Sequence, residues 1–185
     1  IINRSPQTAT DTASTATVLL EFAKSHPFDT IILVQATSPL LTAEDLERGL
    51  ALYQSGEGDS VLSVVRQKRF HWDISPSGLV VPSNYNPTRR PRRQDFPGYF
   101  VEHGAFYITS RQALLESENR ISGRILACEM PEDTFFEIDE PSDWIIVEHL
   151  LHQREASTLS SSLKEICLVV TDCDGVLTDN GMYYT

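Results

Sequence analysis

The run TIILVQA at residues 30–36 decides the fold, because it is a short, continuous apolar stretch that contains β-branched residues. Such a run is typical of a strand buried on both faces of a sheet. A second apolar run, DSVLSVV, occupies residues 59–65. Between the two runs we expect a helix from Thr42 to about Gln54, with Asp45 at position N3 to complete a capping box. Strand, helix and strand in this order predict a parallel α/β sheet.

Helices and strands continue to alternate on both sides of this unit. A helix is predicted from Thr12 to Lys24 with Asp11 as its cap, because Ala, Val and Leu recur there at helical spacing. The remaining predicted elements are strands at 103–109, 125–130 and 166–171, an extended run at 135–139, and helices at 111–118 and from Ser142, as the cap, to about Glu155. This order of elements keeps the whole prediction within the α/β class.

Two segments interrupt the alternation. Residues 66–98 are dense in proline, arginine and aromatic residues, which predicts an excursion from the sheet that forms an arm, a lid or a dimer contact. Residues 156–165 begin with the polar run ASTLSSS and are predicted to be a linker. The chain therefore divides into a first domain at 1–155 and the beginning of a second domain at 166–185.

Charge and composition exclude several classes of partner. The net charge is −11 and the isoelectric point about 4.8, which argues against binding of nucleic acid or of an anionic membrane but leaves a nucleotide possible. No apolar stretch approaches the roughly 20 residues that span a bilayer, and no signal peptide is evident. The three cysteines show no C-x-x-C spacing, which predicts reduced thiols in a cytoplasmic protein and no zinc site.

The first candidate site follows the strand at 30–36. Gln35, Thr37 and Ser38 stand at its carboxyl end, where ligands bind in open α/β sheets, and their short polar side chains could hydrogen-bond a sugar. Ordinary turn and cap chemistry at a strand end is the alternative interpretation.

The second candidate is a basic run within the excursion. Arg89, Arg90, Arg92 and Arg93, followed by Gln94, form a local concentration of positive charge in an acidic protein. Arginine binds carboxylates and phosphates through two parallel hydrogen bonds, so the run could hold an anionic ligand. A solvated loop explains the same residues.

The third candidate is the pair Glu137 and Asp139. In an extended segment these two residues face the same side, and two carboxylates on one face suit Mg²⁺. Alternatively, Asp139 and Ser142 simply begin the next helix, where carboxylates are favourable.

The fourth candidate is the run DCDGVLTD that follows the predicted strand at 166–171. Asp172 and Asp174 share a face, and Gly175 permits a sharp turn after them. One carboxylate could act as a nucleophile toward a phosphoryl group, and the other as its acid/base catalyst.

Taken in order along residues 1–152, these runs resemble the acylneuraminate cytidylyltransferase family. The matching segments are RSP at 4–6 through DTAS at 11–14, LVQATSPL at 33–40, RRQD at 92–95, EHGAFYI at 102–108, and EID at 137–139 with DW at 143–144. The order of the matches carries more weight than any single motif.

The resemblance implies a Rossmann-like nucleotide-diphospho-sugar transferase sheet and a role for several residues. Arg4, Thr10 and Asp11 would lie near the nucleotide. Gln35, Thr37 and Ser38 would contact the sugar acid. Arg93 and Gln94 would meet its carboxylate or the nucleotide phosphates. Asp139 and Glu137 would hold Mg²⁺. The residues for which the resemblance thus implies a role are Arg4, Thr10, Asp11, Gln35, Thr37, Ser38, Arg93, Gln94, Glu137 and Asp139.

Departures from the family pattern concern the sugar and the nucleotide. The family usually has Pro at the position of Ala36, Asn at His103 and often Asp at Glu137, which leaves the exact sugar open. The family's first strand and its phosphate-binding loop would precede Ile1, so we expect a truncated sheet in a piece of a longer protein. This chain by itself is therefore expected to be inactive.

The last residues resemble motif I of haloacid-dehalogenase-like phosphatases, closest to those acting on 3-deoxy-octulosonate 8-phosphate. This resemblance makes Asp172 the nucleophile and Asp174 the acid/base catalyst, both at a magnesium site, in the first strand of a second α/β domain.

Together the resemblances imply an enzyme that activates a sialic-type sugar acid with CTP to give a CMP-sugar and pyrophosphate. Its ligands would be CTP, a nine-carbon 2-keto sugar acid and Mg²⁺, and it would form a dimer, or a tetramer through the phosphatase-like domain. Two alternatives stay open, a sugar-phosphate phosphatase with an accessory domain and a non-catalytic assembly module.

Overall fold

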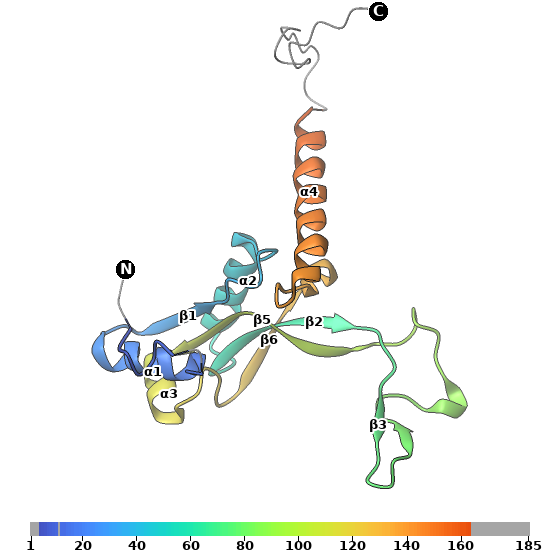
Figure 1. Cartoon of the computed structure of the whole chain (residues 1–185), viewed down its shortest axis with the longest axis horizontal. Coiled ribbons are helices and arrows are strands. Elements are labelled where there is room, and N and C mark those ends of the chain that lie inside the picture. The colour runs from blue at the N-terminus through green and yellow to red at the C-terminus, as the bar shows by residue number, and fades with distance from the viewer. Residues whose placement is uncertain (1–3, 11, 164–185) are drawn as a thin grey trace, which may run out of the picture. The chain divides into compact units, whose positions relative to one another are not determined.

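A four-stranded mixed sheet forms the centre of the computed structural model, which describes residues 4–10 and 12–163 (Figure 1). The strands, in their order across the sheet, are β1 (Thr30–Val34), β5 (Tyr99–Ser110), β2 (Ser60–Gln67) and β6 (Ile125–Met130). The predicted strand at 166–171, together with Asp11, Asp172 and Asp174, lies outside the described residues.

The direction of β5 corrects the prediction of a parallel sheet. β5 lies between β1 and β2 and is antiparallel to both, whereas β2 and β6 are parallel. The chain leaves β2, makes the excursion and returns directly as β5, and such a return needs no crossover helix because antiparallel neighbours can be joined by an open loop. The expected α/β class is thus confirmed, and its parallel character holds for β1, β2 and β6.

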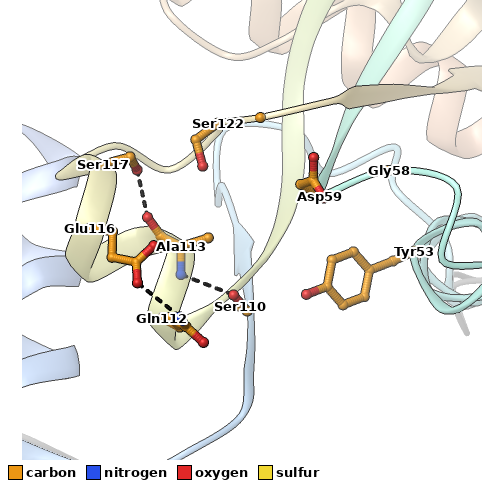
Figure 2. Close-up of a pocket in the computed structure, with 10 residues that line it drawn as sticks. Tyr53, Gly58, Asp59, Ser110, Gln112, Ala113, Glu116, Ser117 and Ser122 are labelled. Carbon is orange, nitrogen blue, oxygen red and sulfur yellow. Dashed lines mark hydrogen bonds between the residues drawn. The ribbon is translucent and has the colours of Figure 1, made fainter.

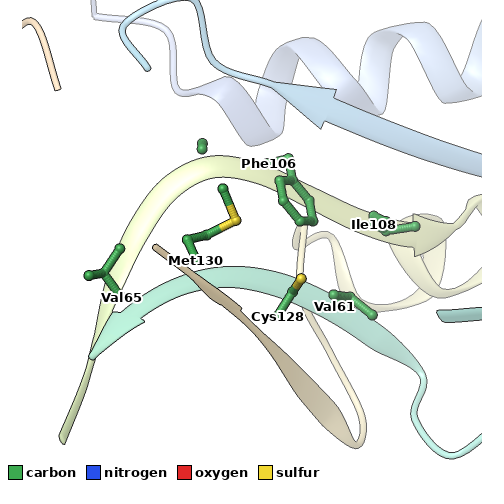
Figure 3. Packing of buried hydrophobic residues seen from close by; sticks show 7 residues of the cluster. Val61, Val65, Phe106, Ile108, Cys128 and Met130 are labelled. Carbon is green, nitrogen blue, oxygen red and sulfur yellow. The ribbon is translucent and has the colours of Figure 1, made fainter. Parts of the chain in front are cut away.

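Two apolar clusters cover the two faces of the sheet. Val61, Phe106 and Ile108 lie among the buried residues of one face (Figure 3), and helix α2 (Ala43–Gln54) packs on this face. Helices α1 (Thr15–Ser25) and α3 (Arg111–Ser117) pack on the opposite face (Figure 1).

The strand β1 is not buried on both faces, as the sequence predicted. Ile31 and Leu33 pack against the cluster of α1, but Ile32 and Val34 on the other face are 39% and 47% exposed. The reason is position, because β1 is the edge strand of the described sheet and the main contacts of α2 are with β2, β5 and β6. The prediction is correct for β2, in which Val61 and Val65 are fully buried.

The capping box predicted for α2 is confirmed. The Thr42 hydroxyl accepts from the Asp45 N–H at 3.3 Å, and the Asp45 carboxylate accepts from the Thr42 N–H at 2.9 Å. Helix α1 begins later than predicted, because its cap is Ser14, whose hydroxyl accepts from the Thr17 N–H, and not Asp11.

The last described helix, α4 (Pro141–Leu163), differs from the prediction at both ends. Its first residue is a proline, whose fixed φ suits the first helical position, so Ser142 lies inside the first turn and is not the cap. The helix also continues through 156–163, where we expected a linker, since no Gly or Pro follows Pro141 before Leu163 to end it. The first compact unit of the chain ends within this helix, at Val147.

Residues 68–98 leave the sheet, two residues later than the predicted start at residue 66 (Figure 1). They contain a two-stranded antiparallel hairpin of β3 (Trp72–Ile74) and β4 (Val80–Pro82), and a short 3₁₀ helix, η1 (Pro87–Arg89). The Phe70 ring packs against the rings of Tyr85 and Phe96, with centroids 4.5 and 5.0 Å away.

Among the described residues, no helix is long and apolar enough to cross a bilayer.

Candidate active site

A bulge in β5 shapes the candidate site. Leu62 of β2 is paired with Tyr107, but Val64, two residues further on, is paired with Glu102. Glu102 and Tyr107 would face opposite sides of a regular strand, and the extra residues of the bulge bring them to the same side. The Ser63 hydroxyl fills the interrupted ladder, since it accepts from the Phe106 N–H at 3.1 Å and lies 3.2 Å from the Phe106 carbonyl oxygen.

Gly104 lies at the centre of this bulge, and polar atoms from three segments surround it. Its φ is +80°, in the left-handed region that favours glycine. A Cβ at this position would lie 2.7 Å from Gln35 Oε1, 3.0 Å from Glu137 Oε1 and 3.7 Å from the Tyr107 hydroxyl. The absent side chain therefore leaves room for these three polar atoms to meet.

Two hydrogen bonds hold the segment before α4 against the turn after β1. The buried Ser38 hydroxyl donates to Glu137 Oε1 at 2.9 Å, and the Ile138 N–H donates to the Thr37 carbonyl at 2.8 Å. Gln35, Thr37 and Ser38 of the first predicted group thus lie together with Glu137 of the third, although the two groups are far apart in the chain. The segment itself is less extended than predicted, since a 3₁₀ helix, η2 (Glu132–Phe135), occupies its start.

An acidic hollow of about 280 Å³ adjoins this cluster. Four carboxylate residues line it, namely Glu102, Glu137, Asp139 and Asp143. None of the described residues that line the hollow is a Lys or an Arg. Burial, together with the charges of Asp139 and Glu102, raises the pKa of Glu137, while the hydrogen bond from Ser38 acts in the opposite direction. A cation in this hollow would relieve the repulsion between the carboxylates.

Glu137 and Asp139 are the residues that could hold Mg²⁺ in this hollow. Within the described part of the chain, no group of three or more His, Cys, Asp or Glu side chains is arranged to hold a metal ion by itself. Mg²⁺ is commonly bound through one or two carboxylates, with water and substrate phosphates completing its shell. Glu137 and Asp139 supply such a pair.

Comparisons with known proteins show which enzymes this chain is similar to. No family model matches the chain. N-acylneuraminate cytidylyltransferase A of Danio rerio is 33% identical over 184 residues, which are 97% of this chain and 42% of that protein. N-acylneuraminate cytidylyltransferase B of the same organism is 37% identical over 153 residues, which are 78% of this chain and 35% of that protein. This chain is similar to N-acylneuraminate cytidylyltransferases. It spans less than half the length of these two relatives.

A solved structure supports the fold. The 4-diphosphocytidyl-2C-methyl-D-erythritol synthase of Anaerococcus prevotii superimposes with a TM-score of 0.57 at 9% identity, covering 75% of this chain and 67% of that one. The mixed sheet with helices on both faces is therefore an α/β fold similar to that of this synthase.

The structure does not bring the arginine run to the acidic hollow. Arg93 and Gln94 are exposed on the excursion and are not among the residues that line the hollow. Neighbouring arginines have local partners, since Arg92 pairs with Asp95 at 2.7 Å and the Arg90 guanidinium lies 4.4 Å from the centre of the Phe70 ring. The anion-binding role of Arg93 stays a prediction.

The residues predicted to lie near the nucleotide are also apart from the hollow. Arg4 lines a different depression of about 440 Å³, formed with residues of α1 and β1. Thr10 is exposed, and its hydroxyl lies 3.4 Å from that of Thr12.

Sequence reasoning gave no role to several residues of the site. Glu102, Tyr107 and Asp143 lie in segments that resemble the family, but no pattern in the sequence indicated that they would meet. Arg120, which contacts Tyr107 and Glu102, lies in a polar turn, and no sequence pattern indicated a role for it.

His103 is a buried polar residue beside the hollow. It is 2% exposed, and neither ring nitrogen makes a hydrogen bond of normal geometry to a described residue. Burial lowers the pKa of His103, while the Thr134 carbonyl and the Asp45 charge act in the opposite direction. A neutral ring is therefore favoured at this position.

A second hollow, of about 540 Å³, lies beside α3 and the beginning of β2 (Figure 2). Its polar groups are largely paired with each other or with the backbone. Gln112 donates to Glu116 at 2.8 Å, and the Asp59 carboxylate accepts from the Arg124 N–H at 2.7 Å. No predicted site residue lines this hollow, so it offers no support for an active site there.

Proposed function

We propose that this chain provides the sugar-acid side of an enzyme that transfers a cytidylyl group from CTP to a sialic-type sugar acid and releases pyrophosphate. The observation that carries the proposal is the meeting of Gln35, Ser38 and Glu137 over Gly104. These groups come from segments that match N-acylneuraminate cytidylyltransferases, and they combine hydrogen-bond donors and acceptors with a carboxylate pair.

The proposed reaction needs positioning more than covalent chemistry. The anomeric hydroxyl of a nine-carbon 2-keto sugar acid would attack the α-phosphate of CTP, and pyrophosphate would leave. Gln35 and Thr37 would orient the sugar by hydrogen bonds, and Ser38 would fix the Glu137 carboxylate. Correct placement of the two reactants contributes a large part of the rate in reactions of this kind.

Glu137 and Asp139 would hold Mg²⁺, which would neutralise charge on the phosphate oxygens. The support is the raised pKa of Glu137, which reflects burial and the nearby carboxylates, and the acidic lining of the hollow. Arg93 and Gln94 would meet the carboxylate of the sugar or the nucleotide phosphates.

Equilibrium binding tests this proposal, because it is measurable whether or not the chain completes the reaction. Calorimetric titration with CTP or with N-acetylneuraminate, in the presence of Mg²⁺, should show binding of at least one of them, and ATP should bind more weakly than CTP. The Asp139→Asn variant should weaken Mg²⁺-dependent binding by at least about tenfold. The matched control is Asp73→Asn, which removes an exposed carboxylate from the hairpin.

Two results would count against a cytidylyltransferase. Absence of binding by CTP and by the sugar acid favours the non-catalytic assembly module. Identical affinities in the Asp139→Asn variant and in the wild type would remove Asp139 from the site.

The remaining features of the proposed protein extend beyond the described residues. The run DCDGVLTD favours a phosphatase-like domain in which Asp172 is the nucleophile and Asp174 the acid/base catalyst at a second magnesium site. A phosphatase with an accessory domain is therefore the second candidate function. We also propose a cytoplasmic homo-oligomer, a dimer through the excursion or a tetramer through the phosphatase-like domain.

A further inference from the structure

Arg120 reaches the candidate site from the turn that follows α3. Its guanidinium carbon lies 4.2 Å from the centre of the Tyr107 ring, and its Nη2 atom donates to Glu102 Oε1 at 3.2 Å. The Tyr107 hydroxyl donates to the same oxygen of Glu102. The three side chains therefore contact one another pairwise, although they come from two separate segments of the chain.

This triad borders the cluster over Gly104. The Tyr107 hydroxyl lies 3.7 Å from the position of a Cβ on Gly104, on the side where Gln35 and Glu137 meet. Tyr107 is almost fully buried, and Glu102, which also lines the acidic hollow, is the most exposed member, with a side chain 46% accessible. The carboxylate of Glu102 is thus the part of the triad that a ligand can reach.

Both hydrogen bonds to Glu102 end on Oε1, and no described residue bonds its second oxygen, Oε2. An ionised carboxylate accepts through both oxygens, so Oε2 keeps its capacity to accept from a ligand hydroxyl. Two donors hold Oε1 in place and thereby orient the whole carboxylate. The direction in which Oε2 points is then fixed as well.

Arg120 also supplies a positive charge next to a cluster of carboxylates. Its pairing with Glu102 offsets the repulsion that Glu102 experiences from Glu137. A planar guanidinium can stack on an aromatic ring and donate to a carboxylate at the same time, which a lysine ammonium cannot do in the same geometry.

We propose that Arg120 is a positioning residue that holds Tyr107 and Glu102 in place. Glu102 Oε2 can then accept a hydrogen bond from a hydroxyl of a polyhydroxylated sugar acid. The choice of ligand class rests on the proposed function. Arg120 would thereby contribute to selection of the sugar, and not to binding of the nucleotide.

The first experiment needs no ligand and tests positioning directly. Ring-flip rates of Tyr107 are measured by NMR on the chain with labelled tyrosine rings, and the signal is assigned with a Tyr107→Phe variant. Arg120→Ala should raise the flip rate at least about tenfold, and Arg120→Lys should give an intermediate rate, because one of the two contacts is retained. The matched control is Arg124→Ala, which removes an arginine of the same turn that pairs with Asp59. An unchanged flip rate in Arg120→Ala would overturn the proposal.

The second experiment measures affinity for N-acetylneuraminate and for CTP, each by calorimetry with Mg²⁺ present. Arg120→Ala should weaken binding of the sugar acid about tenfold and leave the affinity for CTP within about twofold of wild type. If Arg120→Ala weakened the affinities for both ligands equally and also lowered the melting temperature, the role of Arg120 would be merely structural. That result would contradict the proposal.

The two experiments separate this inference from the proposed function. Wild-type chain that binds neither ligand would contradict the proposed function, and the ring-flip result would still decide whether Arg120 positions Tyr107. Wild-type binding of the sugar acid that is unchanged in Arg120→Ala would uphold the function and overturn the part of the inference that concerns sugar selection.

Discussion

Ser38 and Glu137 are 99 residues apart in the chain, yet the Ser38 hydroxyl donates a hydrogen bond of 2.9 Å to Glu137 Oε1. This bond joins the turn after β1 to the segment that precedes α4. It also supplies the hydrogen bond that lowers the pKa of Glu137 against the raising effect of burial. The stability of the fold and the ionisation of the site are therefore coupled through one hydroxyl group.

Replacement of Ser38 by alanine should destabilise the protein and raise the pKa of Glu137 further. Loss of a hydrogen bond to a partly buried carboxylate costs about 1–3 kcal/mol. Chemical denaturation should therefore show a lower free energy of unfolding at neutral pH. The control is Ser117→Ala, because the exposed Ser117 hydroxyl bonds the Ala113 carbonyl of its own helix. Equal stability of Ser38→Ala and wild type would show that the bond contributes nothing.

Gly104 and Gly78 offer a matched pair of substitutions by alanine. Their φ angles are +80° and +81°, so alanine at either position should cost about 1–2 kcal/mol for the left-handed conformation. At Gly104 the new Cβ would also meet Gln35 and Glu137, whereas at Gly78 nothing lies within 4 Å. Gly104→Ala should therefore be less stable than Gly78→Ala by about a further 1–3 kcal/mol in denaturant titrations. Equal losses of unfolding free energy in the two variants would mean that Gln35 and Glu137 move aside for the methyl group at no measurable cost.

Patterns within a short stretch of sequence predicted the elements whose formation does not depend on contacts with distant segments. The capping box of α2 depends on Thr42 and Asp45 alone, and β2 and β6 are mainly apolar over most of their length, so these elements could be assigned from the sequence. The exposure of Ile32 and Val34 depends on which element covers β1, and the direction of β5 depends on its partners. Neither property is encoded within a short window of sequence.

The same distinction applies to the site. Gln35 and Ser38 could be found because they end a strand, and Glu137 and Asp139 because they are two residues apart. The contact of Arg120 with Tyr107 could not be found, since it requires the bulge in β5 and the path of the turn after α3. The only trace of the bulge in the sequence is Gly104. A single glycine does not reveal a left-handed conformation unless the pairing of β5 with β2 is already known.

Arg93 provides a test of the arginine run. If Arg93 binds an anionic ligand, Arg93→Ala should weaken the affinity for the sugar acid or for CTP by at least about tenfold, because a charged pair lost from a desolvated site costs on the order of 2–5 kcal/mol. The control is Arg89→Ala, an exposed arginine of the same run. Calorimetry that gives wild-type affinity for both ligands in Arg93→Ala would favour the solvated loop.

A second ionisable network lies away from the hollow and joins Glu21 of α1 to the segment that precedes this helix. Glu21 accepts from the Thr8 hydroxyl, from the Ser5 N–H at 2.8 Å and from the Ser5 hydroxyl at 3.1 Å. The hydrogen bond from Thr8 is the largest cause of the lowered pKa of Glu21, followed by that from the Ser5 N–H, and the Arg4 charge acts in the same direction. The folded state thus favours the ionised carboxylate.

The stabilisation from Glu21 should consequently depend on pH in one direction. A carboxyl whose pKa is lowered on folding stabilises the protein above its ordinary value of about 4.5, and this contribution disappears as the pH falls through the lowered pKa. Glu21→Gln should therefore lower the melting temperature at pH 7, and the difference from wild type should shrink as the pH falls below about 4.5. Glu47→Gln, at an exposed position of α2, serves as the control for removal of one negative charge. A difference between wild type and Glu21→Gln that stayed constant from pH 7 to acid conditions would mean that ionisation of Glu21 is not what stabilises this network.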